Sequence, residues 1–252
     1  MNKPFVFLLL LACITFSSFA QRPAADLIKT SKGTLSIQPV KHATLVFTWG
    51  GKTIYADPDG GAKAFEGLAT PDLILITDIH GDHYNVETLK AINTSHAKLI
   101  VPQAVADQLP DDLKAKAIIL NNGKTTSQLN IVIKAIPMYN LPEAPDAKHP
   151  KGRGNGYILT FGNTVVYLSG DTAGIPEMRS LKNIDIAFVC MNLPYTMDVP
   201  EAAAAVLDFK PKIVYPYHYR GQNGLSDTEA FKQTITSKDP SIDVRLRNWY
   251  AD

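Results

Sequence analysis

Two carboxylates and two imidazoles follow one another within six residues of the segment 71–83, PDLILITDIHGDH. They are Asp78, His80, Asp82 and His83. The apolar run before them, residues 73–76, is rich in branched side chains and predicts a strand buried on both faces. Charged groups at the end of a buried strand cost free energy unless they are paired or bind a cation. One histidine beside an aspartate usually makes a surface hydrogen bond, but four such groups together favour a metal site.

Two further side chains that could bind a metal ion also follow apolar runs. Asp171 comes after TVVYLSG (164–170), and His218 comes directly after KIVYPY (212–217). Taken alone, Asp171 could cap the following turn, and His218 could be a buried imidazole with a hydrogen bond. Together with the segment 71–83 they repeat one arrangement, in which a potential ligand stands where a strand leaves the sheet. This repetition favours a metal site at one edge of the predicted sheets.

The remaining pattern predicts an α+β protein made of two packed sheets with helices outside. Strands predominate early, with Gly50 and Gly51 forming a hairpin turn, and the second half alternates strands with helices. We expect a last strand at 244–250, VRLRNWY. The long irregular segment 138–154 could cover the site. No internal boundary is evident, so residues 21–252 are expected to form one domain.

The first twenty residues, 1–20, predict a secretory signal peptide. Lys3 precedes an apolar run that extends to Phe19, and small residues at its end predict cleavage after Ala20. The run is shorter than the roughly 20 apolar residues of a membrane span, so we favour cleavage over an uncleaved anchor. A lipoprotein site at Cys13 is an alternative that the apolar residues after it disfavour. We expect a periplasmic or secreted protein that is not stably inserted in the membrane after cleavage.

Charge and cysteine content exclude some partners and bonds. Without Lys3, 24 of the 25 basic residues remain against 24 acidic residues, so there is no basic excess that would bind nucleic acid. After cleavage Cys190 is the one remaining cysteine, which excludes an internal disulfide. Cys190 lies in an apolar run typical of a buried strand, where a thiol packs as a small hydrophobic group. We expect a small-molecule substrate, and the sequence indicates no oligomeric state.

The segment TDIHGDH (77–83) resembles the Thr-His-x-His-x-Asp-His motif of the metallo-β-lactamase superfamily of hydrolases. The later Ser-Gly-Asp that ends in Asp171 and the histidine His218 follow in the family's order. The upstream HATLVFTWGGKTIYADP (42–58) is similar to the opening of a branch that includes ascorbate-6-phosphate lactonase and N-acyl-phosphatidylethanolamine phospholipase D. The resemblance covers 42–218. It implies a four-layer αββα sandwich with one or two metal ions, usually zinc, at one edge of the paired sheets.

The resemblance implies one complete metal position and one altered position. Asp82, His83 and His218 match the ligands of the first position. Asp171 matches the carboxylate that bridges two metal ions in many members of the family. The resemblance also places the residues at 42 and 57 near the site without making them ligands.

The second position departs from the family's pattern. Its first histidine is Asp78 here, its second is His80, and its third, at the end of KAIPMY, is Asn140. Carboxylate and amide oxygens suit harder ions such as manganese. Three outcomes follow: one ion at the first position, two ions with the second bound weakly, or a second position completed by His149. A pseudo-enzyme without an ion is a fourth. We expect zinc, as one or two ions, with manganese or iron as alternatives.

A bound metal ion would supply a hydroxide at neutral pH and would polarise the substrate's oxygen. This implies hydrolysis of an ester, lactone, phosphodiester or amide bond. Besides ligating, Asp82 would orient that hydroxide and act as the catalytic residue. We expect Asn140, His149, Tyr195 and Arg220 to bind the substrate, with Arg220 holding a carboxylate or phosphate.

A periplasmic binding or sensing module is the rival function. Such a protein would use the metal structurally, with four protein ligands closing the site, whereas a catalytic site keeps a position open for water. A fold does not determine a substrate, and β-lactam hydrolysis is not implied.

Overall fold

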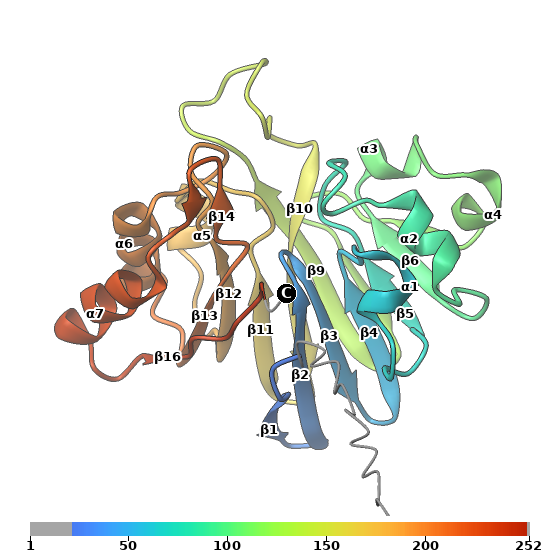
Figure 1. Cartoon of the computed structure of the whole chain (residues 1–252), viewed down its shortest axis with the longest axis horizontal. Helices are drawn as coiled ribbons and strands as arrows, with labels where there is room; N and C mark the ends of the chain where they lie inside the picture. The colour runs from blue at the N-terminus through green and yellow to red at the C-terminus, as the bar shows by residue number, and fades with distance from the viewer. Residues whose placement is uncertain (1–21, 251–252) are drawn as a thin grey trace, which may run out of the picture.

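The computed structural model describes residues 22–250, so the predicted signal peptide, residues 1–20, lies outside the described range. Two mixed sheets of seven strands each form the centre of the molecule (Figure 1). The first sheet has the order β1-β2-β3-β4-β5-β6-β7. Its strands are β1 (Asp26–Thr30), β2 (Gly33–Lys41), β3 (Thr44–Trp49), β4 (Lys52–Ala56), β5 (Leu73–Leu75), β6 (Lys98–Val101) and β7 (Ala117–Ile119).

The second sheet has the order β16-β13-β12-β11-β10-β9-β8. Its strands are β8 (Thr125–Gln128), β9 (Ile131–Met138), β10 (Gly154–Phe161), β11 (Thr164–Leu168), β12 (Ile186–Cys190), β13 (Ile213–Tyr217) and β16 (Asp243–Val244). A separate two-stranded ribbon pairs β14 (Arg220–Gly221) with β15 (Gly224–Leu225). The hairpin turn expected at Gly50 and Gly51 is confirmed, since it joins β3 to β4.

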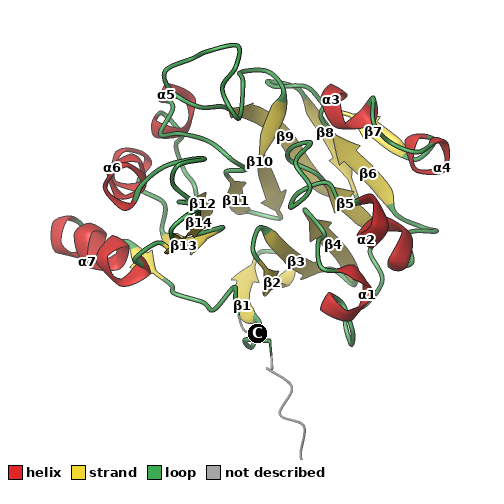
Figure 2. Cartoon of the chain, turned by 45° about the horizontal axis from the view of Figure 1, so that its top comes forward, coloured by secondary structure: helices red, strands yellow, loops and turns green. Residues whose placement is uncertain are grey.

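Helices cover the outer faces of both sheets (Figures 1 and 2). Those on the side of the first sheet are α1 (Gly61–Ala64), α2 (Val86–Ala91), α3 (Gln103–Ala106) and α4 (Asp111–Lys114). Those on the side of the second are α5 (Pro176–Arg179), α6 (Val199–Phe209) and α7 (Thr228–Lys238). The expected four-layer αββα sandwich is thus confirmed. None of the described helices is long and apolar enough to cross a membrane.

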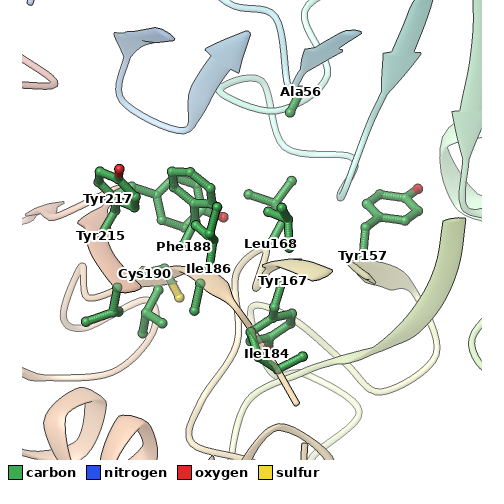
Figure 3. Packing of buried hydrophobic residues seen from close by; sticks show 14 of the residues in the cluster. Ala56, Tyr157, Tyr167, Leu168, Ile184, Ile186, Phe188, Cys190, Tyr215 and Tyr217 are labelled. Carbon is green, nitrogen blue, oxygen red and sulfur yellow. The ribbon is translucent and has the colours of Figure 1, made fainter. Parts of the chain in front are cut away.

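The strand that leads into the metal-binding segment is buried on both faces, as the sequence predicts. Leu73 and Leu75 of β5 belong to the core between the two sheets, whereas Ile74 packs with residues of the outer helices. On the second sheet, aromatic rings fill the core (Figure 3), and Phe188 stacks on another ring with centroids 5.0 Å apart. Cys190 is fully buried and free in the same strand as Phe188. It packs as the small hydrophobic group that the sequence predicts.

Parallel pairing brings the ends of distant strands to one edge of the sandwich. In the first sheet, β4 and β5 are parallel, and in the second, β11, β12 and β13 are parallel. A polar residue of the site or its surroundings follows each of these strands. These residues lie close together because the carboxyl ends of parallel strands meet at the same edge. The segments that follow the strands are 57–60, 76–85, 169–175, 191–198 and 218–219.

The expectation of a last strand at 244–250 is wrong. β16 ends at Val244, and although the backbone N–H of Arg245 still donates to the carbonyl of Val214 in β13 at 2.9 Å, no strand pairing continues beyond it among the described residues. Arg247 forms a 2.6 Å ion pair with Asp26, and the carbonyl of Trp249 accepts a hydrogen bond from the backbone of His42. These contacts hold the end of the described chain against the edge where the strands finish.

Gly170 stands where β11 delivers the next residue to the site, and it has no room for a side chain. Its φ is +61°, and an added Cβ would lie 2.6 Å from Met138 Sδ and 3.0 Å from the carbonyl oxygen of Asn155. We therefore expect Gly170→Ala to lower the free energy of unfolding, measured in urea, by about 2–5 kcal/mol, combining left-handed strain with overpacking.

Gly123→Ala separates the two contributions. Gly123 also has a positive φ, +81°, but an added Cβ there meets nothing within 4 Å. It should cost only the backbone part, about 1–2 kcal/mol. Equal losses in the two variants would show that packing around Gly170 carries no weight.

Candidate metal centre

Four side chains converge where β5, β11 and β13 leave their sheets. His83 Nε2 lies 3.1 Å from His218 Nε2 and 3.3 Å from Asp171 Oδ2. His218 Nε2 lies 3.3 Å from Asp171 Oδ1 and 3.3 Å from Asp82 Oδ2. Asp82 Oδ1 is 3.8 Å from His83 Nε2. We call Asp82, His83, Asp171 and His218 the primary cluster.

Three ligand atoms of the primary cluster, one each from His83, Asp171 and His218, lie within 4.8 Å of one another and fit one tetrahedral ion, whereas Asp82 forms a group with His42 and His218. Ligand atoms about 2.0–2.1 Å from zinc lie about 3.3 Å from one another at the corners of a tetrahedron. Imidazole nitrogen and carboxylate oxygen are donors that zinc accepts. Asp171 Oδ1 is buried and has no hydrogen-bond partner among residues 22–250, as expected of an atom that faces an ion. The structure thus brings together the side chains that the sequence predicts for the first position.

A buried carboxylate orients the His83 ring. Asp57 Oδ2 accepts a 2.9 Å hydrogen bond from His83 Nδ1, which turns Nε2 toward the other ligands. Thr77 donates twice to Asp57, from its backbone N–H at 2.8 Å and from its hydroxyl at 2.6 Å. A carboxylate on the outer nitrogen of a histidine ligand fixes its tautomer and increases its basicity. Asp57 has a left-handed φ of 44°, so the turn after β4 is shaped to place this carboxylate.

Opposite charges control ionisation in the primary cluster. Burial alone would raise the pKa of Asp171, but His218 and His83 outweigh it and hold that pKa well below its usual value. Burial alone would lower the pKa of His83, but Asp171 and Asp57 outweigh it and raise that pKa well above its usual value. Burial likewise opposes the lowered pKa of Asp82, which hydrogen bonds from His218 and His42 produce. Protons and a cation therefore compete for the same nitrogen lone pairs, and ion binding releases protons.

A second cluster lies beside the first. Asp78, His80 and His149 each direct one ligand atom to a common region, and these atoms lie within 4.8 Å of one another. Asp78 Oδ2 is 2.9 Å from His80 Nδ1 and 3.9 Å from His149 Nε2. His149 Nε2 is also 3.2 Å from Asp171 Oδ2, is buried, and has no hydrogen-bond partner within the described part of the chain. We call Asp78, His80 and His149 the secondary cluster, and Asp171 lies between the two clusters.

Asn140 supports His149 instead of facing an ion. Its Oδ1 accepts a 2.8 Å hydrogen bond from the backbone N–H of His149 and lies 3.2 Å from His149 Nδ1. Its Nδ2 donates to the backbone carbonyl of Tyr195 at 2.9 Å. Both the oxygen and the nitrogen of the Asn140 amide therefore have hydrogen-bond partners. The geometry favours a supporting role for Asn140 over binding of an ion or a substrate. The imidazole of His149 takes the place that the sequence comparison gives to the residue at position 140.

Two neighbours of the site, Arg153 and Tyr250, were not predicted from the sequence. Arg153 binds both carboxylate oxygens of Asp78, at 3.0 and 2.8 Å. His42 Nε2 lies 3.1 Å from Asp82 Oδ2, and His42 Nδ1 lies 2.6 Å from the hydroxyl of Tyr250. The resemblance does place position 42 near the site, but no local pattern links it to residue 250.

A cavity of about 360 Å³ opens onto both clusters. Its lining residues are His80, Asp82, Lys148, His149, Asp171, Asn192 and Tyr195. Lys148 and His149 come from the irregular segment between β9 and β10, which thus covers the site as expected. Tyr195 lies where a substrate residue is expected. Arg220 is not among the lining residues. Its guanidinium instead lies 4.4 Å from the centre of the Tyr250 ring.

Asn192 is a cavity residue that the sequence did not single out. It is buried, and its backbone N–H bonds to the hydroxyl of Thr196 at 3.1 Å, while the same hydroxyl donates to its Oδ1. Within residues 22–250 no hydrogen bond uses its Nδ2. The signal that could have found it is its place directly after the parallel strand β12, which ends at the same edge as the ligand strands.

The fold and the site together define a metal-binding protein of the sandwich class. The model of the "Beta-lactamase superfamily domain" matches residues 36–218. A UPF0173 metal-dependent hydrolase of Pyrococcus abyssi is 30% identical over 199 residues, which cover 75% of this chain and 87% of the relative. The chain belongs to the metallo-β-lactamase superfamily and, within it, to the family of UPF0173 metal-dependent hydrolases.

Solved structures agree with this placement. A protein of Parabacteroides distasonis, described as a metal-dependent hydrolase, is 39% identical with a TM-score of 0.77, over 88% of this chain and 97% of that chain. The metallo-β-lactamase fold protein YhfI of Bacillus subtilis has a TM-score of 0.66 at 13% identity, over 82% of this chain and 89% of its own. The second likeness shows the fold alone. Both support the metallo-β-lactamase fold that the motif predicts.

Asn140→Ala tests the supporting role of the amide. Removing it leaves the His149 backbone and ring without their acceptor, so an ion at the secondary cluster should bind about 10- to 100-fold more weakly, while the primary cluster keeps its ion. Equilibrium dialysis followed by elemental analysis measures both. Asn140→Asp keeps the acceptor oxygen and should retain most of the affinity. Loss of the tightly bound ion in Asn140→Ala would contradict this division between the clusters.

Proposed function

We propose that the protein is a metal-dependent hydrolase that cleaves an ester, lactone, phosphodiester or amide bond in a small molecule. The observation that carries the proposal is the placement of two ligand clusters around one shared carboxylate, Asp171, at the wall of a cavity. A site with a purely structural ion would be closed to solvent. Here the cavity reaches ligands of both clusters, so water and substrate have access to them.

The donor set of His83, Asp171 and His218 favours zinc at the primary cluster, and three protein ligands leave a tetrahedral ion one position for water. At the secondary cluster, two imidazoles and the carboxylate of Asp78 suit zinc, and also manganese or iron. When bound, the ions supply an acidified water and an electrophilic partner for the substrate's oxygen. We infer two ions, with the secondary one held more weakly.

The chain's own residues would divide the remaining tasks. Asp82 is the catalytic residue of this proposal, because it lines the cavity and can orient a water molecule and accept its proton. His42 Nε2 lies 3.1 Å from Asp82 Oδ2 and helps to position this carboxylate. The free Nδ2 of Asn192 and the Tyr195 hydroxyl are donors that could stabilise negative charge on the substrate's oxygen. Lys148 at the cavity wall would attract an anionic group.

The substrate class is narrowed by resemblance and by size. The segment 42–58 resembles the branch of ascorbate-6-phosphate lactonase and N-acyl-phosphatidylethanolamine phospholipase D, so lactones and phosphodiesters come first in a substrate panel. A cavity of about 360 Å³ suits a small molecule. Anionic members of each class should be preferred because of Lys148. The rival proposal, a binding or sensing module with a structural ion, predicts retention of such ligands without turnover.

His83→Ala is the decisive variant. It removes a ligand atom that lies near both Asp171 and His218, so we expect loss of the tight ion and activity below about one hundredth of the wild type on the best panel substrate. Elemental analysis and a hydrolysis assay measure the two effects. His96→Ala, at an exposed histidine, should change neither. Full activity of a metal-free His83→Ala protein would contradict a metal-dependent reaction.

Export is a second proposal. The apolar run in residues 1–20 supports removal of a signal peptide after Ala20 and release into the periplasm or the medium. The full chain, expressed in a Gram-negative host, should appear in the periplasmic fraction with an intact mass that begins at Gln21. A cytoplasmic product that retains residues 1–20 would contradict export. A lipid-modified product that begins at Cys13 would favour the lipoprotein alternative instead.

A further inference from the structure

Asp78 is fully buried and is gripped by a guanidinium. Arg153 Nε donates to Asp78 Oδ1 at 3.0 Å, and Arg153 Nη2 donates to Asp78 Oδ2 at 2.8 Å. This bidentate pairing uses both carboxylate oxygens. Little water reaches the pair, since the side chain of Asp78 has no exposed surface and that of Arg153 is 19% exposed. The same Nη2 also donates to the backbone carbonyl of Lys148. Arg153 is therefore fixed in place.

One of the two oxygens that Arg153 binds, Asp78 Oδ2, also faces the secondary cluster. Asp78 Oδ2 is 2.9 Å from His80 Nδ1 and 3.9 Å from His149 Nε2. A metal ion bound by the secondary cluster and the guanidinium of Arg153 would both contact this one carboxylate oxygen. Two positive charges on one buried oxygen repel each other, and the repulsion is strong because little water screens it.

The primary cluster has no such competitor. Within residues 22–250, the ion-pair contacts of Asp82 and Asp171 are all with imidazoles, and none is with a lysine or an arginine. Asp78, by contrast, is paired with a guanidinium, which stays protonated in proteins. The two positions therefore differ in one permanent positive charge.

We propose that Arg153 is a resident cation of the secondary position, which neutralises Asp78 when no ion is bound there and weakens the binding of that ion. The ion at the secondary cluster is then the exchangeable one of the two. The alternative, that Arg153 serves mainly to place His149, is disfavoured because Asn140 already holds His149 by three contacts: two from its Oδ1, and one from its backbone N–H to the His149 carbonyl at 2.9 Å. The inference rests on the proposed two-ion site.

The test measures how the metal-free mature chain binds zinc alone. Equilibrium dialysis at buffered free zinc, with elemental analysis of the protein, gives the two binding steps. We expect Arg153→Met to tighten the weaker binding step by about tenfold or more and to leave the tight step unchanged. Arg153→Lys keeps the charge without the fork and should stay within about threefold of the wild type. Arg220→Met removes an exposed cation that does not line the cavity, and should change neither step.

Thermal melting supplies a second readout. The melting temperature of metal-free Arg153→Met should lie below that of the wild type, because Asp78 is left buried without its arginine partner. Zinc should raise the melting temperature of Arg153→Met by more than it raises that of the wild type. If Arg153→Met does not fold, Arg153→Gln can still donate to Asp78 without a charge and is read in the same way.

The possible results separate this inference from the proposed function. An unchanged or weakened second step in both neutral variants overturns the resident cation and leaves the two-ion site standing. Weakening in Arg153→Lys as well as Arg153→Met would assign Arg153 to positioning. Failure of the wild type to bind zinc at all overturns the proposed function, and the inference with it.

Discussion

The structure depends on one buried carboxylate that three imidazoles surround. Asp171 is 3% exposed and lies 3.2–3.3 Å from His83, His149 and His218. Burying a carboxylate is costly unless it is paired, so these contacts must form together or the edge of the sandwich is destabilised. They also join the layers, because His83 follows a strand of the first sheet while Asp171 and His218 follow strands of the second. The requirement to balance one charge thus links the packing of the two sheets to the assembly of the site.

Three of the ligands are in turn held by partners that do not line the cavity. Asp57 turns the His83 ring, Asn140 holds His149, and Arg153 holds Asp78. Two of the residues at this edge, Asp57 and His218, adopt left-handed backbone conformations that are uncommon outside glycine. Such conformations cost about 1–3 kcal/mol each and persist only where the surroundings hold them. The sheets and the supporting hydrogen bonds supply that restraint.

The two metal positions are related but not equivalent. Imidazole and carboxylate ligands that carry no permanent counter-charge define the primary cluster, whereas the secondary cluster includes a carboxylate that is already paired with arginine. The replacement of an imidazole by Asp78 adds a negative charge, and Arg153 removes it again, so the pair has the net charge of one neutral histidine. The departure from the family's motif is therefore compensated in the folded protein. In the two-ion site that we propose, this substitution would alter how firmly the second ion is bound without removing the position itself.

The sequence by itself determined the features that repeat locally. The apolar run of β5 and the polar residues after it predicted the strand-end cluster, and the same pattern before Asp171 and His218 predicted that they lie at the same edge, because strand periodicity and strand ends are local properties. The resemblance to the family then assigned these residues to one metal position. Only the tertiary structure placed His149 beside His80, Arg153 on Asp78, and Asn192 at the cavity. It also ended the last strand at Val244 and brought Tyr250 to His42, a contact between residues 208 positions apart. These contacts come from irregular segments, in which no repeating pattern of apolar residues fixes direction, so the packing of the two sheets decides which side chains meet.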